Sequence, residues 1–189
     1  MIIMGQKVPG TNIPYEGGDG MFSLFRPLIQ ATDGLTLGQV SKLTGLEGST
    51  IQNWVKRGFV SRPVEKKYRD RQLARILLIS SLRDGMPLDR IGELMSFVNG
   101  DANDTGDDII SEEKLYDYFC SIIGRAEHAA LTENYVRELT REVTADYQPP
   151  NENAADVLTE ALTIMVLAYL AGVLKREADA LFQRIKEKQ

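Results

Sequence analysis

The chain of 189 residues is 43% hydrophobic and 26% charged, which is the composition of an ordinary globular protein with a core of its own. Its formal net charge of −5 excludes a molecule that is basic over its whole surface. The lone cysteine, Cys120, excludes an intramolecular disulfide and fits a reducing compartment. The first apolar run is too short for a signal peptide, so we expect a cytoplasmic protein.

Charge is distributed unevenly along the chain. Residues 35–98 contain 11 Lys or Arg and 6 Asp or Glu, whereas residues 99–189 contain 9 basic and 18 acidic residues. A basic head on an acidic body is typical of a DNA reader joined to a partner or sensor domain. The competing explanation is that the acidic body is only well solvated.

Residues 1–34 predict an irregular lead-in that ends in one short apolar helix. Gly and Pro are frequent up to residue 19, and no hydrophobic period is visible there. Gly17 to Gly20 do not form a phosphate-binding loop, because no strand precedes them and no GKS or GKT follows. Residues 21–31 are apolar and can form a helix broken near Pro27, packed on the head or on the C-terminal body.

Residues 35–63 predict two short helices joined by a tight turn. Thr36 can cap the first helix, whose buried stripe recurs every three residues at Leu37, Val40 and Leu43. Gly45 can adopt the positive φ that reverses the chain, and Leu46 can fill the gap between the helices. The second helix is expected over residues 47–57, before Gly58, with three side chains turned inward: Ile51, Trp54 and Val55.

This pattern is a helix-turn-helix, in which the second helix reads the major groove of DNA. Because Gln and Asn pair with adenine through two hydrogen bonds, the outward residues are the expected base contacts: Ser49, Thr50, Gln52 and Asn53. Phosphate contacts are expected from the end of this helix and from a tiny hairpin after Pro63: Lys56, Arg57, Lys66, Lys67, Tyr68 and Arg69. In the hairpin, Val64 is expected to pair with Tyr68 across a tip made by Glu65 and Lys66. The competing interpretation is a helix face that is merely solvated.

Two more helices complete the head. Asp70 can cap a helix that runs to about Leu82, with an inner stripe of Leu73, Ile76, Leu77 and Ser80. Pro87 to Asp89 open the next one, which is apolar at helical spacing at Leu88, Ile91, Leu94, Met95 and Val98.

Four segments within residues 35–98 resemble the DNA-binding head of MerR-family transcription regulators: LGQVSKLTG, STIQNWVKRG, KKYRDRQLARI and DGMPLDRIGELM. The last two are the more specific, because helix-turn-helix motifs alone are common. The resemblance implies a winged helix-turn-helix head. Gln52 and Asn53 stand where the family has an arginine and a tyrosine, and the wing between Pro63 and Tyr68 is shorter than the family's. Most of the chain also resembles an uncharacterised bacterial family, number 1836 among the domains of unknown function.

Residues 99–110 are polar and acidic and predict a linker to an all-helical C-terminal domain over residues 111–189. Ser111 can cap the first helix there, whose apolar face is Leu115, Tyr118, Phe119, Ile122 and Ile123. The next helix is expected to stop before Pro149 and Pro150, and its apolar positions are Leu131, Tyr135, Leu139 and Val143.

The longest helix is expected over residues 153–188. It is apolar on nearly all sides from Val157 to Leu174, but its uninterrupted apolar run is about 14 residues, against the ~20 that a bilayer requires. A helix buried in a bundle or a dimer is therefore favoured over a membrane span. The second half is amphipathic, and one side of it carries Ala178, Leu181, Phe182 and Ile185. A homodimer through the C-terminal helices is expected, because one small head has few base contacts and the long apolar helix needs cover.

Catalytic and metal-binding patterns are weak, so we expect no enzyme activity, metal or cofactor. Cys120 and His128 are the only soft ligands, and they stand eight residues apart without companions. Several aromatic and sulfur-containing residues of the tail can line a ligand pocket, although such residues also form plain core: Tyr116, Tyr118, Phe119, Met165 and Tyr169.

We therefore expect a mostly α protein with a MerR-like head and a very short wing, which binds double-stranded DNA as a homodimer, without a membrane, and regulates transcription. An unknown small-molecule effector acting on the tail is compatible with this expectation. One alternative is a protein-interaction module whose head no longer binds DNA, and another is a sensor whose tail does the main work. Binding of duplex DNA by residues 35–98 alone would discriminate among these functions.

Overall fold

The computed structural model describes residues 7–14, 20–104, 106–126 and 132–187. The predicted mostly helical fold is confirmed for these residues, and the only named sheet among them has two short strands, β1 (Leu35–Thr36) and β2 (Lys67–Tyr68). A 3-10 turn, η1 (Met21–Leu24), precedes the helices, which are α1 (Arg26–Thr32), α2 (Leu37–Thr44), α3 (Gly48–Lys56), α4 (Asp70–Leu82), α5 (Leu88–Asn99), α6 (Glu112–Arg125), α7 (Glu133–Val143) and α8 (Ala154–Lys186).

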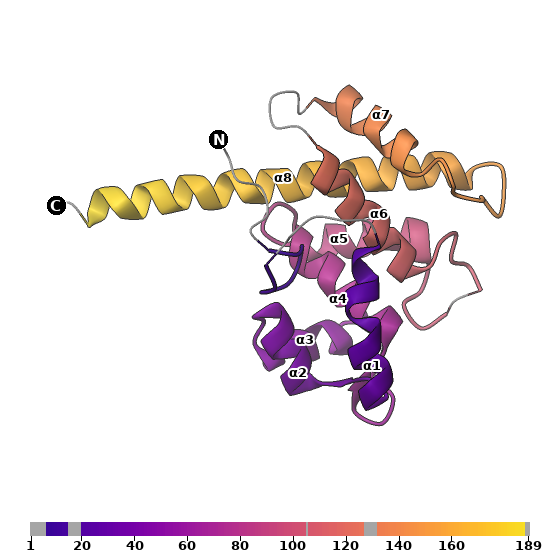
Figure 1. Cartoon of the computed structure of the whole chain (residues 1–189), viewed down its shortest axis with the longest axis horizontal. Coiled ribbons are helices and arrows are strands. Elements are labelled where there is room, and N and C mark those ends of the chain that lie inside the picture. Colours follow the sequence, from indigo (N-terminus) through magenta and orange to yellow (C-terminus); the bar gives the residue numbers. More distant parts are fainter. Residues whose placement is uncertain (1–6, 15–19, 105, 127–131, 188–189) are drawn as a thin grey trace.

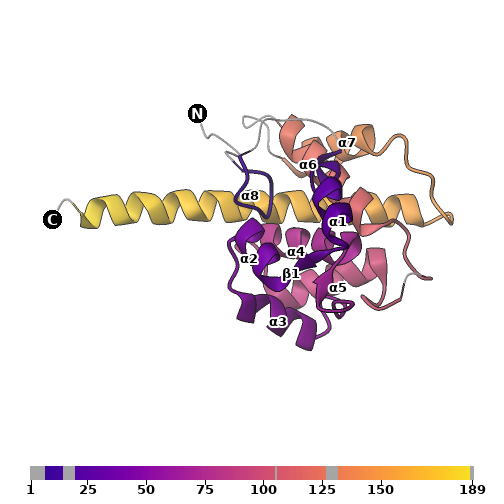
Figure 2. The ribbon, with the colours of Figure 1, turned by 60° about the horizontal axis from the view of Figure 1, so that its bottom comes forward.

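The helix α4 lies at the centre of the molecule, between the head formed by α2 and α3 and the body formed by α6 and α8 (Figures 1 and 2). The sequence predicts one inner stripe for it, but ten of its residues are buried, including Gln72 and Arg75. Other elements cover α4 on opposite sides, so its three remaining residues, Asp70, Arg71 and Ser80, are only partly exposed. One continuous hydrophobic core consequently extends from Val8 to Leu170.

The lead-in is not separate from this core. Val8 is only 1% exposed, and residues 8 and 13 close a tight loop through the hydrogen bond from the Val8 N–H to the Ile13 carbonyl oxygen, 2.7 Å. The apolar segment that follows has its break at Phe25, between η1 and α1, and Pro27 lies in the first turn of α1. The two halves pack differently, because Phe22 contacts Tyr116 of α6 edge-on, whereas α1 lies against β1.

The predicted acidic linker is anchored to the core by a few buried residues, while most of its other described residues are exposed. Asn99 and Ala102 are buried, and the N–H of Ile109 donates to the carbonyl oxygen of Val98 at 2.9 Å. Arg71 of α4 holds this segment, since its guanidinium donates to the Asp104 carbonyl at 2.7 Å and pairs with the Asp108 carboxylate at 3.3 Å. The head and the tail are therefore packed together along α4 rather than through a free linker.

The predicted helices of the tail are confirmed, with small changes at their ends. Ser111 caps α6, since its hydroxyl accepts from the N–H of Lys114, and the predicted apolar face of α6 is buried. α7 turns Val136, Leu139 and Thr140 inward; Leu131, which the sequence places on this helix, lies outside the described residues.

The long helix α8 consists of two different halves. From Ala154 to Gly172 it packs against the body, and beyond this it extends alone past the rest of the molecule (Figures 1 and 2). By length and composition α8 is one helix able to cross a membrane, but 56% of its apolar window is buried inside the protein. The core helix of a soluble protein passes the same test, so this feature is weak evidence for a membrane.

Candidate nucleic-acid interface

The first helix of the pair, α2, begins with a reciprocal cap. The Thr36 hydroxyl accepts from the Gln39 N–H at 3.4 Å, while the Gln39 side chain accepts from the Thr36 N–H at 2.8 Å. Two amide groups that lack a partner inside the helix are thereby satisfied. Val40 is fully buried in this helix, and Leu37 and Leu43, which the sequence places on the same stripe, are half-buried.

The turn between α2 and α3 has the predicted geometry. Gly45 adopts φ 73°, a left-handed conformation that glycine reaches without strain. Leu46 is 4% exposed and fills the space between the helices, and the Thr44 hydroxyl accepts from the Leu46 N–H at 3.2 Å. The entry into α3 is therefore fixed by backbone conformation, a hydrogen bond and an apolar contact.

The second helix, α3, begins at Gly48, one residue later than predicted, and presents one apolar and one polar face. Ile51 and Trp54 are 0% and 3% exposed, which confirms the prediction that they face the core. Thr50 is half-buried, and the remaining predicted base contacts are exposed: Ser49, Gln52 and Asn53. The burial of the apolar face leaves these polar groups pointing away from the protein.

The predicted hairpin is present, but its pairing differs by one residue. Val64 pairs with Lys67, through N–H to oxygen hydrogen bonds of 3.0 and 2.8 Å, instead of with Tyr68. Glu65 and Lys66 form the predicted tip and have φ of 50° and 63°. A two-residue turn with both central residues at positive φ requires its immediate neighbours to pair, and this leaves Tyr68 free to pair with Leu35 of β1.

The base of the hairpin is held by a buried glutamine that sequence reasoning missed. The side-chain oxygen of Gln72 accepts from the Arg69 N–H at 2.7 Å, and its NH₂ donates to the Arg62 carbonyl oxygen at 2.8 Å. One side chain of α4 thus joins the two legs of the wing. The only signal in the sequence was a polar residue on the inner side of an apolar helix.

The six predicted phosphate contacts are not equivalent. Tyr68 is 3% exposed and its burial raises the pKa of its phenol, so its ring belongs to the core and the sequence prediction of a surface contact fails there. The Lys67 ammonium donates to the carbonyl oxygen of Thr32, at the end of α1. Arg69 pairs with Asp33 at 3.2 Å, and this pair is largely exposed.

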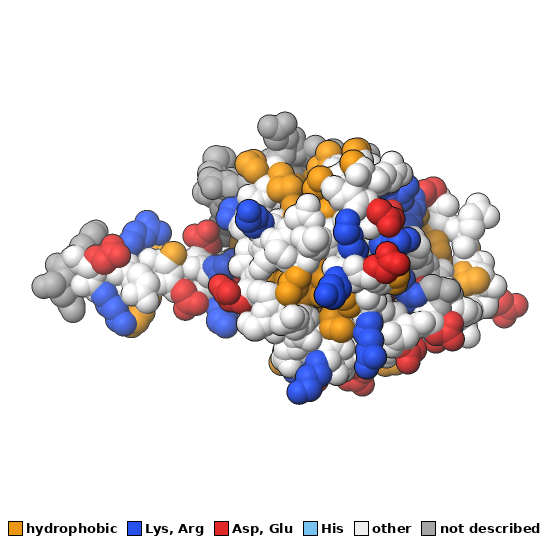
Figure 3. Space-filling model, turned by 90° about the horizontal axis from the view of Figure 1, so that it is seen from below, with side chains coloured by type: hydrophobic (Ala, Val, Ile, Leu, Met, Phe, Trp, Pro, Cys, Tyr) orange, Lys and Arg blue, Asp and Glu red, His pale blue; other side chains and the backbone are white. Residues whose placement is uncertain are grey.

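The cations nearest to α3 are better placed for a ligand. Lys56 and Lys66 are exposed and have no ionic partner among the described residues. Arg57 pairs with Asp89 at 2.5 Å and lies over the Phe59 ring, 4.7 Å from its centroid. Basic side chains stand out across this face of the molecule, with apolar patches between some of them and acidic side chains beside others (Figure 3).

A buried ion pair supports α3 from behind. The Arg75 side chain, 5% exposed, donates from Nε to the Phe59 carbonyl oxygen at 2.6 Å and from Nη1 to the Glu112 carboxylate at 2.5 Å. Burial raises the pKa of Glu112, and the positive charge of Arg75 opposes this shift. The C-terminal end of α3 is therefore tied through α4 to the first turn of α6.

The candidate pocket residues of the tail are mainly core. Tyr116, Phe119 and Met165 are fully buried, and Tyr118 and Tyr169 are 4% and 6% exposed. Cys120 is buried and its burial raises the pKa of its thiol, while His128, the other soft ligand of the sequence, lies outside the described residues.

The sequence matches a family model described as "Domain of unknown function (DUF1836)" over residues 29–119, which confirms the expected resemblance for this part. The matched range extends from α1 into α6. The chain is also 25% identical, over 145 residues, to the uncharacterized protein YkrK of Bacillus subtilis (strain 168), an alignment that covers 71% of this chain and 62% of that protein. The chain thus spans less than two thirds of the length of this curated relative. No solved structure matches the chain.

Proposed function

We propose that the protein is a DNA-binding transcription regulator of MerR-like type, which reads an operator through α3 and a short basic wing. The observation that supports this most is the orientation of α3. Its apolar residues are buried, whereas Gln52 and Asn53 are exposed on the same helix as Lys56. Lys56 and Lys66 are exposed too and form no ion pair within the described part of the chain. Polar amides read base edges, whereas cations contact phosphates.

The proposal separates two kinds of contact. Replacing Lys56 and Arg57 by Ala weakens binding to every duplex, because phosphate contacts carry no sequence information. Replacing Gln52 and Asn53 by Ala changes the preferred sequence, with about 1–3 kcal/mol of discrimination lost for each two-bond amide contact. Asn134 on α7 is an exposed amide on the body, so its replacement by Ala is a matched control.

The experiment is DNA selection from a random duplex pool with the full chain, followed by fluorescence anisotropy of the selected duplexes at several salt concentrations. We expect an enriched inverted repeat, and an affinity that falls steeply with salt because bound cations release counterions from DNA. Unchanged affinity in the Lys56→Ala/Arg57→Ala variant would refute the assignment of these contacts.

The homodimer is proposed to form through the free half of α8. Four large apolar side chains are exposed there by more than half: Leu174 53%, Leu181 55%, Phe182 57% and Ile185 59%. Leu174, Leu181 and Ile185 belong to a longer series with an alternating spacing of three and four residues, which is typical of a coiled-coil seam. The series is Ile164, Leu167, Ala171, Leu174, Ala178, Leu181 and Ile185. An isolated amphipathic helix of this length is only marginally stable in water, so we propose that a second copy of the chain buries its apolar side chains.

Charge favours an antiparallel arrangement of the two copies. When Ala178 faces Leu181 of a second copy, Leu174 faces Ile185, and Glu177 lies beside Arg184 on both flanks of the seam. A parallel arrangement would instead bring Glu177 beside Phe182. Only the antiparallel register therefore joins opposite charges.

A charge exchange tests the register by sedimentation equilibrium. Glu177→Lys or Arg184→Glu alone replaces two attractive contacts by repulsive ones, so we expect dimer dissociation constants about 5–30-fold higher, from roughly 1–2 kcal/mol. The double variant restores dimerisation. Asp179→Lys, on the opposite face of the helix, is the control. Failure of the double variant to recover would contradict the antiparallel register.

A protein-interaction module remains the second candidate. It is favoured by the pairing of Arg57 with Asp89 and of Arg69 with Asp33, which already satisfies two predicted phosphate contacts. Weak binding of all duplexes without enrichment, in a protein that still dimerises, is the result that this function predicts.

A further inference from the structure

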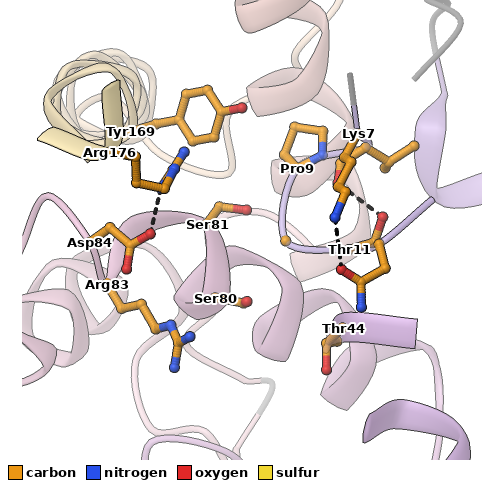
Figure 4. A pocket seen from close by; sticks show the side chains of 13 residues that line it. Lys7, Pro9, Thr11, Thr44, Ser80, Ser81, Arg83, Asp84, Tyr169 and Arg176 are labelled. Atoms are coloured by element: carbon orange, nitrogen blue, oxygen red, sulfur yellow. Dashed lines mark hydrogen bonds and ion pairs between the residues drawn. The ribbon is translucent and has the colours of Figure 1, made fainter. Parts of the chain in front are cut away.

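A polar cavity of about 290 Å³ lies where the lead-in, the helix pair, α4 and α8 meet. Lys7, Thr11 and Thr44 stand on one side of it, and Ser80, Arg83 and Arg176 stand on the other (Figure 4). The wall residues thus come from four segments that are far apart in sequence. The function proposed above uses none of them.

The lead-in wall of the cavity is firmly attached to the protein. The Tyr116 hydroxyl, buried in α6, donates to the Pro9 carbonyl oxygen at 2.7 Å, and the Asn12 N–H donates to the Leu43 carbonyl oxygen at 2.8 Å. Gly10 has φ 76°, and a Cβ atom there would lie 2.3 Å from the Leu77 carbonyl oxygen. Only glycine lets this loop lie directly on α4, so the cavity is preorganised rather than an accident of a loose segment.

The charges of the cavity are unbalanced. Asp84 is its acidic lining residue, and Arg176 pairs with that carboxylate. In the described part of the chain, Lys7 donates to the neutral Asn12 side chain at 3.2 Å, and neither Lys7 nor Arg83 has an ionic partner. Both residues are exposed, so two positive charges line the cavity without a carboxylate of the described residues paired to them.

The hydroxyl groups of the walls supply a second kind of recognition. The Thr11 and Ser81 hydroxyls donate to the carbonyl oxygens of Val8 and Leu77, at 2.9 and 2.7 Å. The Thr11 hydroxyl also accepts from the Ile13 N–H at 3.0 Å, so one lone pair of Thr11 and the lone pairs of Ser81 can accept from a ligand. The Ser80 hydroxyl has no hydrogen-bond partner in the described part of the chain and can donate.

We infer that this cavity binds a small phosphorylated metabolite that carries hydroxyl groups. A phosphate monoester has the charge that matches Lys7 and Arg83, and such anions form strong charge-assisted hydrogen bonds with both types of side chain. The hydroxyl groups of the ligand donate to Thr11 and Ser81. The volume accommodates a small sugar or glycerol phosphate and is at the low end of the range for ligand sites.

The ligand would also connect the head with the long helix. Thr44 directly precedes the Gly45 turn, and Arg176 lies on α8 at the beginning of its free half. A ligand that bridges these elements stabilises one orientation of the head relative to α8. This regulatory consequence rests on the proposed DNA-binding function, whereas ligand binding itself does not.

The test is isothermal titration calorimetry of the full chain, without DNA, using glycerol 3-phosphate as the probe and glycerol at the same ionic strength as the reference. We expect binding of glycerol 3-phosphate and none of glycerol. Arg83→Gln and Lys7→Gln should each weaken binding by about tenfold or more, since each removes one charged hydrogen bond. Thermal unfolding of each unliganded variant checks that it is folded.

Two matched variants locate the site. Arg90→Gln removes an exposed cation of α5 that does not line the cavity, and Lys56→Ala/Arg57→Ala removes the proposed DNA-phosphate contacts. Both should bind glycerol 3-phosphate like the unmodified chain. Absence of binding, or equal loss in all variants, would overturn the inference while leaving duplex binding untouched. Loss only in the Lys56→Ala/Arg57→Ala variant would place the anion on the DNA-binding face and would also overturn it.

Discussion

Replacement of Glu112 by Gln tests whether the buried ion pair behind α3 maintains the fold. The Glu112 side chain is 0% exposed and that of Arg75 is 5% exposed. The amide has almost the same size as the carboxylate but no charge, so in the variant the buried Arg75 guanidinium loses its anionic partner and keeps neutral acceptors such as the Phe59 carbonyl oxygen. Removing one partner of such a pair costs about 3–5 kcal/mol.

Two features place the expected cost near the lower limit. Burial raises the pKa of Glu112 in spite of Arg75, which means that the ionised carboxylate is not fully compensated in the protein. Its Oε2 atom also has no hydrogen-bond partner. We therefore expect about 3 kcal/mol, which for a chain of this size lowers the melting temperature by roughly 6–12 °C.

Thermal unfolding followed by circular dichroism and by the fluorescence of Trp54, the single tryptophan, measures this loss for the whole chain and for the head. Glu138→Gln is the matched control, because Glu138 pairs with Arg141 at an exposed site and its loss should cost at most about 1 kcal/mol. Equal melting temperatures in the two variants would refute the conclusion that the Arg75 charge is desolvated.

Three further predictions concern the stability of the fold. Because the pKa of Glu112 is raised, its carboxyl group binds a proton more readily in the folded state than in the unfolded state, so its contribution to the free energy of unfolding increases as pH falls toward its ordinary pKa near 4.5. The difference in the free energy of unfolding between the unmodified chain and Glu112→Gln should therefore widen between pH 7 and 5. Denaturant titrations at both pH values measure it. Gly85→Ala should cost several kcal/mol in the same titrations, since its Cβ would lie 1.9 Å from the Ala168 carbonyl oxygen of α8. Gly38→Ala, with no atom within 4 Å of its Cβ, should instead stabilise α2 by roughly 0.5–1 kcal/mol, and a loss would contradict the helix assignment.

Local patterns predicted the elements of this protein well. The cap at Thr36, the positive φ at Gly45 and the buried Ile51 and Trp54 depend on residues that are close in sequence, so single-sequence reasoning could reach them. The ends of α4 and α5 followed from the same kind of signal.

Long-range pairing could not be read from the sequence. Arg75 and Glu112 are 37 residues apart, and the sequence alone is compatible with a solvent-exposed position for each side chain. Their burial follows from the packing of other elements on opposite sides of α4, which the sequence does not show. Val8 and Pro9 form part of the core only because Gly10 can lie on the backbone of α4. The hairpin register failed for a related reason, since the partner that captures Tyr68 is Leu35, which lies outside the hairpin.

The charged residues that follow Gly172 on α8 relate these features to one another. Gly172 is buried against the turn after α4, where a Cβ atom would lie 3.1 Å from the Gly85 nitrogen, so α8 cannot move there without displacing that turn. One turn later, Arg176 pairs with Asp84 at the cavity, and the next residue, Glu177, lies on the flank of the seam proposed for the dimer. A rotation of α8 that changed the proposed dimer seam would therefore move Arg176 away from Asp84 and alter the charge of the cavity. Ligand binding and dimer geometry should consequently be coupled. By linkage, the factor by which glycerol 3-phosphate changes the dimer dissociation constant should equal the factor by which dimerisation changes the affinity of the protein for glycerol 3-phosphate.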